Sequence, residues 1–539
     1  MLPTEQSNPL TSGLDRVFAS STTDGVRMLQ RVDREVLKRF REVVVSDEFR
    51  TLVETVTQTV REGGRVVFSG CGATGRLSIL LESMWHAACA RDQRTTGYAD
   101  RVASIMTGGD FALVRSVESF EDFARFGRQQ VCELDLGRED VLVAITEGGE
   151  TSSVLGTVDE ALDRGAKVFL LFNNPAEVLC KYIERSRRAI TDPRVTVLDL
   201  FCGPMALAGS TRMQATTAEQ LVAGAALELT IAALLGRPGG DFAAGFEQVL
   251  ELLENGAPAI AGYIEFEEKI YRGHGKITYF ADEYLLDIFT DTTERSPTFM
   301  LPPFRPHDDT TSPAPWAFVK NPRFPTAEVW NRSLRRPLRC LEWGADDYRR
   351  MNAPERLIES PPRLRAEELK KIEIGSEPCP ERCTAADAAV LFYCGEPERE
   401  LADAFLRFAA GCGEKKRLAL SAPGDFSIPG EIPDSPLRLM RHLAVKLLFN
   451  TISTGVMVRL GRVTGNWMSF VSVSNKKLID RGIRLIAELG RIPYRESCDR
   501  FFTAVEEIEK LRRPGEEPPP VVQYVLARLE AERKPEQQP

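Results

Sequence analysis

The chain has 539 residues, of which 43% are hydrophobic and 27% charged, which is the composition of a globular protein with roughly two to four domains. Its net charge of −9 argues against a surface for nucleic acid, although hydroxyl and backbone N–H groups can still hold a small phosphate. The sequence has neither a signal-peptide pattern nor an apolar run long enough for a membrane span, so we expect a cytoplasmic protein without membrane association.

The eleven cysteines are scattered, as in proteins of a reducing compartment. Cys379 and Cys383 have the spacing of a metal clip, but no second Cys/His pair accompanies them. We therefore expect two unpaired thiols and no metal.

The N-terminal segment is polar and mixed over residues 1–24, which predicts an arm that packs late or stays mobile. From Val26 to Glu62 the apolar residues recur at helical spacing, and this predicts helices leading into the first domain.

A glycine-rich turn follows the first predicted strand. Val66–Phe68 is apolar, Gly70, Gly72 and Gly75 come next, and Arg76–Ala90 is predicted to be a helix. Glycines let the backbone approach a ligand closely, and the unpaired N–H groups of a helix N-terminus favour an anion. The spacing is not that of a nucleoside-triphosphate loop. It fits the dinucleotide fingerprint, which is weak evidence alone, and a tight turn without a ligand remains an alternative.

Further apolar strands and intervening helices predict a parallel sheet covered on both faces, with ligands beyond the carboxyl ends of its strands. The other strands are predicted over Val102–Met106, Asp140–Ile145, Lys167–Phe172 and Val195–Leu200, and the helices over Glu118–Val131, the residues up to Asp163, and Thr217–Leu235.

The pattern then begins again, which predicts an internal repeat of about 200 residues and two α/β domains of one fold. After a linker helix over Phe246–Tyr271, Gly275–Phe280 echoes Gly64–Phe68, but Ala281–Leu286 replaces the glycine loop. Residues 300–360 are rich in Pro and Arg and predict an irregular insertion or an elaborated edge of the sheet. We expect an N-terminal arm with helices (1–50), a first domain with the ligand site (51–245), a degenerate second domain (246–465) and a helical C-terminal cap (466–539).

Five short motifs follow one another along the chain: Gly70–Leu77, Gly209–Met213, Ser453–Met457, Gly465–Asn466 and Ser474–Leu478. In these motifs the chain resembles the N-acetylmuramic acid 6-phosphate etherases. The first is similar to their glycine loop, the second to their Gly-Ser-Ser/Thr-Arg-Met motif, and the last three to their C-terminal signature. This resemblance implies the sugar isomerase (SIS) fold, an α/β fold with a parallel sheet flanked by helices. The tandem arrangement with a helical cap is similar to the glucokinase regulatory proteins, which bind fructose phosphates and are not enzymes.

The etherases remove lactate by elimination, which needs a base and an acid. By resemblance Glu121 matches one carboxylate, whereas Met84 replaces the other. The missing acidic motif occurs in the second copy, where Asp291–Phe299 includes Glu294. One hypothesis is that Glu294 reaches the first site and completes it. The alternative is that Glu294 only caps a helix or pairs with an arginine.

The expected ligand is a phosphorylated sugar or amino sugar held in the first domain. Its predicted contacts are Gly72, Thr74, Gly75, Arg76, Thr146, Gly148, Thr151, Ser152, Ser210 and Thr211, with Lys477 added by resemblance to the regulatory proteins. Glu150 would repel a phosphate, so it either points away or meets a hydroxyl or amine of the ligand.

Two functions remain open from the sequence. The first is a sugar-phosphate sensor that binds a protein partner such as a sugar kinase, which the broken acid motif favours. The second is an etherase-like lyase or a sugar-phosphate isomerase, which Glu121 permits. Neither needs a metal or a cofactor, and a dinucleotide-dependent redox role is disfavoured because the second strand ends at Met106 without an acidic residue.

Overall fold

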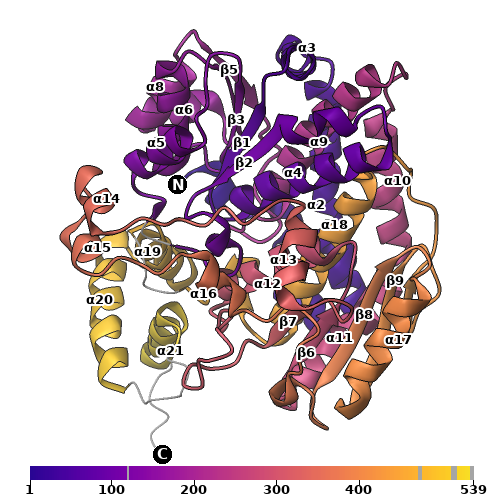
Figure 1. Cartoon of the computed structure of the whole chain (residues 1–539). Coiled ribbons are helices and arrows are strands. Elements are labelled where there is room, and N and C mark those ends of the chain that lie inside the picture. Colours follow the sequence, from indigo (N-terminus) through magenta and orange to yellow (C-terminus); the bar gives the residue numbers. More distant parts are fainter. Residues whose placement is uncertain (118–119, 472–475, 512–518, 534–539) are drawn as a thin grey trace, which may run out of the picture.

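The computed structural model describes the chain except residues 118–119, 472–475, 512–518 and 534–539, and the side chains of residues 476 and 477 also lie outside the described part. In Figure 1 the first half of the chain lies above the second, and the C-terminal helices (yellow) lie beside them. The first half contains α1 (Leu14–Ser20), α2 (Thr22–Val43), α3 (Asp47–Glu62), β1 (Val66–Gly70), α4 (Ala73–Arg91), β2 (Val102–Met106), α5 (Ala124–Glu133), β3 (Val141–Ile145), α6 (Ser152–Asp163), β4 (Lys167–Phe172), α7 (Ala176–Tyr182), α8 (Glu184–Ile190), β5 (Val195–Asp199) and α9 (Gln214–Leu234).

The second half and the C-terminal part continue the same alternation of strands and helices. They contain α10 (Phe242–Asn255), α11 (Ala257–Arg272), β6 (Ile277–Phe280), α12 (Leu285–Phe299), β7 (Ala317–Lys320), α13 (Thr326–Leu334), α14 (Ala345–Arg350), α15 (Glu355–Glu359), α16 (Ala366–Lys370), β8 (Ala388–Cys394), α17 (Arg399–Phe408), β9 (Glu414–Leu420), β10 (Phe426–Ile428), α18 (Leu439–Arg459), β11 (Val463–Thr464), β12 (Trp467–Met468), α19 (Lys476–Gly490), α20 (Tyr494–Leu511) and α21 (Val521–Arg533).

Each half contains a parallel five-stranded sheet. The first has the order β2-β1-β3-β4-β5 and the second β10-β9-β8-β6-β7. The two orders coincide when β6 to β10 are matched to β1 to β5, so the predicted repeat of one α/β fold is confirmed. Strands β1, β2 and β3 are buried along their whole length, because helices cover both faces of the sheet.

Of the two alternatives for the Pro- and Arg-rich segment 300–360, the structure has an elaborated edge, because the segment contains the edge strand β7, the counterpart of β2, and the helices α13, α14 and α15. One sequence prediction in the second half was wrong. The single linker helix is two helices, α10 and α11, that meet at Gly256, and the proline at position 258 starts the second of them.

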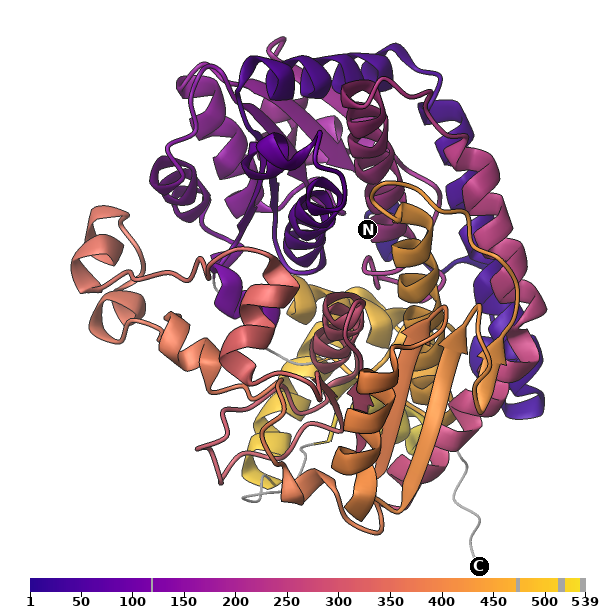
Figure 2. The same cartoon turned by 45° about the vertical axis from the view of Figure 1, so that its right-hand side comes forward.

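The long helices α2, α9, α11 and α18 pack against one another and join the two halves, and α2 (indigo) runs along one side of both halves in Figure 2. Helix α9 is long and apolar enough to cross a membrane by length and composition, which departs from the sequence prediction. However, 83% of the apolar stretch of α9 is buried inside the structure, as expected for a helix of the protein core.

The N-terminal arm is packed rather than mobile. Thr4 and Thr11 are buried, and the Thr11 hydroxyl donates to the Ala206 carbonyl at 2.8 Å. The Gly209 N–H donates to the Thr4 carbonyl at 3.2 Å, so the arm supports the loop that precedes α9.

The predicted C-terminal helices are present as α19, α20 and α21, here called the helical cap. Cys379 and Cys383 are free thiols.

Candidate functional site

The glycine loop turns β1 into α4. The Thr74 hydroxyl accepts from the Cys71 N–H at 3.0 Å and donates to the Cys71 carbonyl at 2.9 Å, which fixes the turn. Gly72 has a φ of 59°, and a Cβ there would meet no atom within 4 Å. Position 72 is therefore open on its outer side, and the first N–H groups of α4 face that space.

A cavity of about 180 Å³ lies at the carboxyl ends of the first sheet, in front of this loop. The predicted residues that line it are Gly72, Glu121, Gly148, Thr151, Ser210, Thr211 and Glu294. The predicted residues that do not line it are Thr74, Gly75, Arg76, Thr146 and Ser152. Thr74 and Thr146 instead bond residues of the cavity wall: Thr74 bonds the backbone of Cys71, and Thr146 donates a hydrogen bond to Thr151 at 3.1 Å. Ser152 instead lines a groove beside the cavity.

The loop Gly209–Met213 supplies hydroxyl groups to the cavity. Ser210 is 3% exposed, and its Oγ has no hydrogen-bond partner among the described residues. Such a buried hydroxyl costs free energy unless a ligand or water satisfies it. Lys446 of α18 holds this loop from the second half, because its Nζ donates to the carbonyls of Arg212 and Met213 at 3.0 and 3.1 Å.

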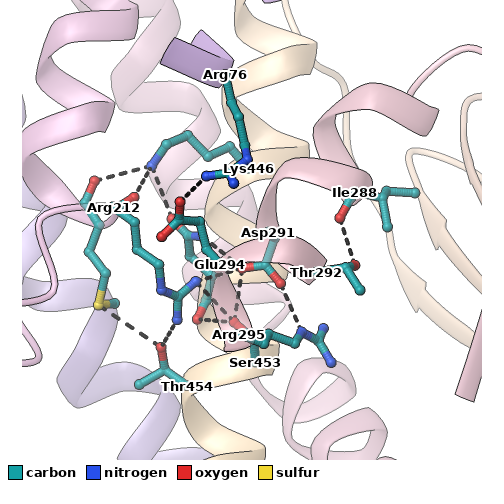
Figure 3. A network of polar contacts seen from close by, with 12 residues as sticks. Arg76, Arg212, Ile288, Asp291, Thr292, Glu294, Arg295, Lys446, Ser453 and Thr454 are labelled. Carbon is teal, nitrogen blue, oxygen red and sulfur yellow. Dashed lines mark hydrogen bonds and ion pairs between the residues drawn. The ribbon is translucent and has the colours of Figure 1, made fainter. Parts of the chain in front are cut away.

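Arg76 and Glu294 form an ion pair that joins the two halves (Figure 3). The Arg76 side chain is fully buried and also donates to the Ala112 carbonyl at 2.8 Å. Burial lowers the pKa of Arg76, and the charge of Glu294 opposes this shift. Glu294 pairs with an arginine, as the alternative hypothesis expected, and that arginine belongs to the glycine loop. Its carboxylate also lines the cavity.

Helix α12 is fixed around Glu294 by a buried network (Figure 3). Asp291 accepts from Arg212 at 2.7 Å, from Arg295 at 3.1 Å and from Ser453 at 2.9 Å. Arg212 also lines the cavity. The sequence motif Gly209–Met213 contained Arg212, but nothing in the sequence linked it to Asp291.

Glu121 lies in a turn, not in the helix predicted from residue 118; the described helix α5 begins at Ala124. The Glu121 carbonyl accepts from the Ser153 N–H at 3.0 Å. Phe120 next to it is fully buried, and its ring stacks on Trp343 with centroids 6.0 Å apart. The insertion that contains α14 and α15 therefore packs directly on the segment that carries Glu121. Sequence reasoning missed this contact.

Two further glutamates border the cavity. Glu150 pairs with Arg185 at 3.1 Å, which offsets the repulsion that its charge would exert on a phosphate. Glu147 accepts from the Thr216 hydroxyl at 3.4 Å. Burial first, and then the charge of Glu147, raises the pKa of Glu219 well above its usual value. Burial behind the cavity thus disfavours the charged form of the Glu219 carboxyl group.

The helical cap reaches the cavity mouth through α19. Leu478 and Arg481 line the cavity, and Arg481 pairs with Glu5 of the N-terminal arm at 2.7 Å. Lys477 lies on the same helix, but its side chain is outside the described residues.

In the second half, the residues that follow β6 form ion pairs of their own. Arg323 pairs with Asp282 at 2.8 Å and with Glu398 at 2.6 Å, and Arg438 pairs with Glu283. These side chains occupy the region after β6 where the first half has its glycine loop.

Residues 48–162 match the family described as "Glucokinase regulatory protein N-terminal SIS domain". The chain is 33% identical over 220 residues to the N-acetylmuramic acid 6-phosphate etherase of Trichormus variabilis, which covers 41% of this chain and 64% of that relative. It is 30% identical over 222 residues to the same enzyme of Lactococcus lactis subsp. cremoris, which covers 41% of this chain and 67% of the relative.

Among solved structures, the chain is similar to tagatose-6-phosphate ketose/aldose isomerase from Escherichia coli, with a TM-score of 0.44 and 11% identity over 83% of this chain and 95% of that one. This likeness is too low to carry an argument about function. The sequence match to the curated relatives spans about two thirds of their length. With this coverage and 30% identity, the chain belongs to the N-acetylmuramic acid 6-phosphate etherase family of SIS-domain proteins.

Proposed function

We propose that the protein is a lyase that eliminates lactate from N-acetylmuramic acid 6-phosphate or a closely related sugar phosphate. The observation that carries the proposal is that Glu121 and Glu294, one from each half of the chain, line the same cavity beside the glycine loop. Two carboxyl groups in different surroundings can divide the roles of base and acid.

In this proposal the sugar phosphate binds at the N-terminus of α4. Backbone N–H groups after Gly72 and the hydroxyls of Thr151, Ser210 and Thr211 meet the phosphate and sugar oxygens. The unpartnered Ser210 hydroxyl supports such a polar ligand. Lys477 is proposed as a further contact from the helical cap.

Glu121 then takes the C2 proton of the ring-opened sugar, and the electron pair forms the C2–C3 double bond as the C3–O bond breaks. Glu294 protonates the departing lactate oxygen. The ion pair with Arg76 holds the Glu294 side chain in place at the cavity.

Lactate release from N-acetylmuramic acid 6-phosphate tests the proposal. We expect turnover by the wild type and a loss of at least about 100-fold in Glu121→Gln and in Glu294→Gln. Exchange of the C2 hydrogen with deuterated water should persist in Glu294→Gln and vanish in Glu121→Gln. Glu283→Gln, at an ion-paired glutamate after β6 in the second half, is the matched control and should retain wild-type turnover.

The match to the regulatory-protein family favours a second candidate, a sugar-phosphate sensor with a protein partner such as a sugar kinase. It predicts no lactate release, together with thermal stabilisation by a sugar phosphate that Glu294→Gln leaves intact. A wild type that releases lactate at enzymatic rates rejects this candidate.

A further inference from the structure

A small chamber of about 30 Å³, here called the inner chamber, adjoins the cavity at the boundary between the two halves. Its walls come mainly from α4 and α9 of the first half and from α12 and α18 of the second. It shares Ala73, Arg212 and Glu294 with the cavity of about 180 Å³. Glu294 therefore borders both the proposed ligand site and the inner chamber.

Two buried N–H groups on these walls lack a hydrogen-bond partner among the described residues. Gln220 of α9 is 1% exposed, and the group concerned is its Nε2. Arg212 is 4% exposed, and the group concerned is its Nε, since its terminal nitrogens bond Asp291 and two hydroxyls of α18. A buried donor without an acceptor costs free energy, so both groups indicate that an acceptor occupies the inner chamber.

The charges on the walls favour an acceptor that is neutral and can also donate. The carboxylates of Asp287, Asp291 and Glu294 all border the inner chamber. A halide ion would accept from the two N–H groups, but it has no proton to donate to the carboxylates and would be repelled by them. A cation could not accept from the N–H groups at all. A water molecule meets both requirements, because its two lone pairs match the two donors and its protons remain for carboxylate oxygens.

The size of the inner chamber fits a water molecule. A buried water needs roughly 10–15 Å³ of space and makes about three hydrogen bonds. The inner chamber has about 30 Å³ of space. Lys446 also borders it, but the Lys446 ammonium group already donates to two carbonyls, to Thr217 and to Asn450. The two N–H groups and the Glu294 carboxylate are therefore the partners that we assign to the water.

We propose that the inner chamber holds an ordered water molecule that accepts from Gln220 and Arg212 and donates to the Glu294 carboxylate. Arg76 holds this carboxylate through an ion pair, and the water is its second support. Gln220 is then a positioning residue, which acts on Glu294 through the water. For catalysis this inference rests on the proposed function, in which Glu294 protonates the lactate oxygen. Lactate release should depend on Gln220, whereas removal of the C2 proton by Glu121 should not.

High-resolution crystal structures of the wild type and of Gln220→Met, both grown with bromide, test the water directly. In the wild type we expect a density peak about 2.9 Å from Gln220 Nε2 and from Arg212 Nε, without the anomalous signal of bromide. Gln220→Met keeps the length of the side chain but removes the N–H, so the peak should vanish and the Glu294 carboxylate should shift. The absence of the wild-type peak, a bromide signal in its place, or an unmoved Glu294 in the variant overturns the inference.

Two rates distinguish a positioning role from a general loss of stability. We expect Gln220→Met to release lactate about tenfold more slowly and to exchange the C2 hydrogen at the wild-type rate. Gln30→Met is the matched control, because Gln30 is a buried glutamine of α2 that donates to the Leu253 carbonyl at 2.9 Å. It should lower the melting temperature and leave both rates unchanged. Equal losses of both rates in Gln220→Met overturn the inference.

The crystal structures also separate this inference from the function on which it rests. If the wild type releases lactate but shows no water peak, the lyase stands and the inference is overturned. If the wild type releases no lactate, the proposed function fails. A water peak that disappears in Gln220→Met together with a shift of Glu294 then still supports the inference, and a Glu294 that stays in place overturns it.

Discussion

Arg76 and Glu294 are 218 residues apart in the chain, yet their side chains are paired at the boundary between its two halves. The first half supplies the glycine loop, but in the helix α4 that follows, Met84 stands where the family has an acid. The second half supplies the acid on α12 but has lost the loop. The ion pair connects the two surviving parts, so the site depends on how the halves pack.

Breaking this pair should destabilise the protein as well as inactivate it. Arg76→Met leaves the Glu294 carboxylate without its partner, and we expect a loss of about 3 kcal/mol in unfolding free energy. Glu294→Gln should cost less, because the amide oxygen can still accept from Arg76. Melting temperatures of the wild type, both variants and the double variant measure the coupling. Strictly additive shifts would show that the two side chains do not interact.

The parts of the site that are local in sequence could be predicted. Gly70–Leu77 and Gly209–Met213 carry the loops in short motifs, and the apolar runs identify the strands before them. The remaining parts depend on tertiary packing. Strand β7 was hidden in a Pro- and Arg-rich segment because a short strand leaves little periodic signal. No pattern in the sequence relates Arg212 to Asp291, or Trp343 to Phe120.

Trp343 should affect catalysis through Glu121. Its ring packs on Phe120 and also on Phe126, with centroids 5.6 Å apart. Trp343→Ala removes this support, and a displacement of about 1 Å at Glu121 can cost up to about 100-fold in rate. We expect kcat for lactate release to fall at least tenfold while KM changes little.

Trp316→Ala is the matched control for this variant, because Trp316 packs on Tyr271 in the second half, with centroids 5.2 Å apart. It should lower the melting temperature without this effect on kcat. Equal losses of kcat in both variants would mean that Trp343 acts only through overall stability.

Ser210→Ala should separate binding from stability. The hydroxyl is buried without a partner in the described part of the empty protein, so its removal should leave the melting temperature unchanged or slightly higher. The affinity for N-acetylmuramic acid 6-phosphate should fall by about tenfold, because the ligand loses a hydrogen bond. Thermal stabilisation by this ligand should weaken accordingly.

Ser69→Ala is the comparison for Ser210→Ala, since the Ser69 hydroxyl bonds Thr157 at 2.8 Å away from the cavity. We expect Ser69→Ala to lower stability and to leave affinity unchanged. Undiminished ligand stabilisation in Ser210→Ala would remove Ser210 from the proposed site.

Lys446 and Asp33 should give the protein a stability minimum near neutral pH. Burial lowers the pKa of Lys446 from 10.5 to about 7, and burial raises the pKa of Asp33 from 3.8 to about 7. Above pH 7 the unfolded chain holds a proton on Lys446 that the folded chain has lost, so stability rises with pH. Between about pH 4 and 7 the folded chain holds the extra proton on Asp33, so stability falls as pH rises.

Substitution of Lys446 can show whether this residue causes the rise in stability above pH 7. Lys446 contributes at most about 1.4 kcal/mol per pH unit to the slope between pH 7 and 9. Lys446→Met should flatten the melting temperature over this range, because methionine binds no proton in either state. Lys269→Met, at an exposed position on α11, should keep the wild-type slope. A wild-type slope in Lys446→Met would mean that another group titrates there. The loop Gly209–Met213 would then be held by a lysine that stays charged throughout.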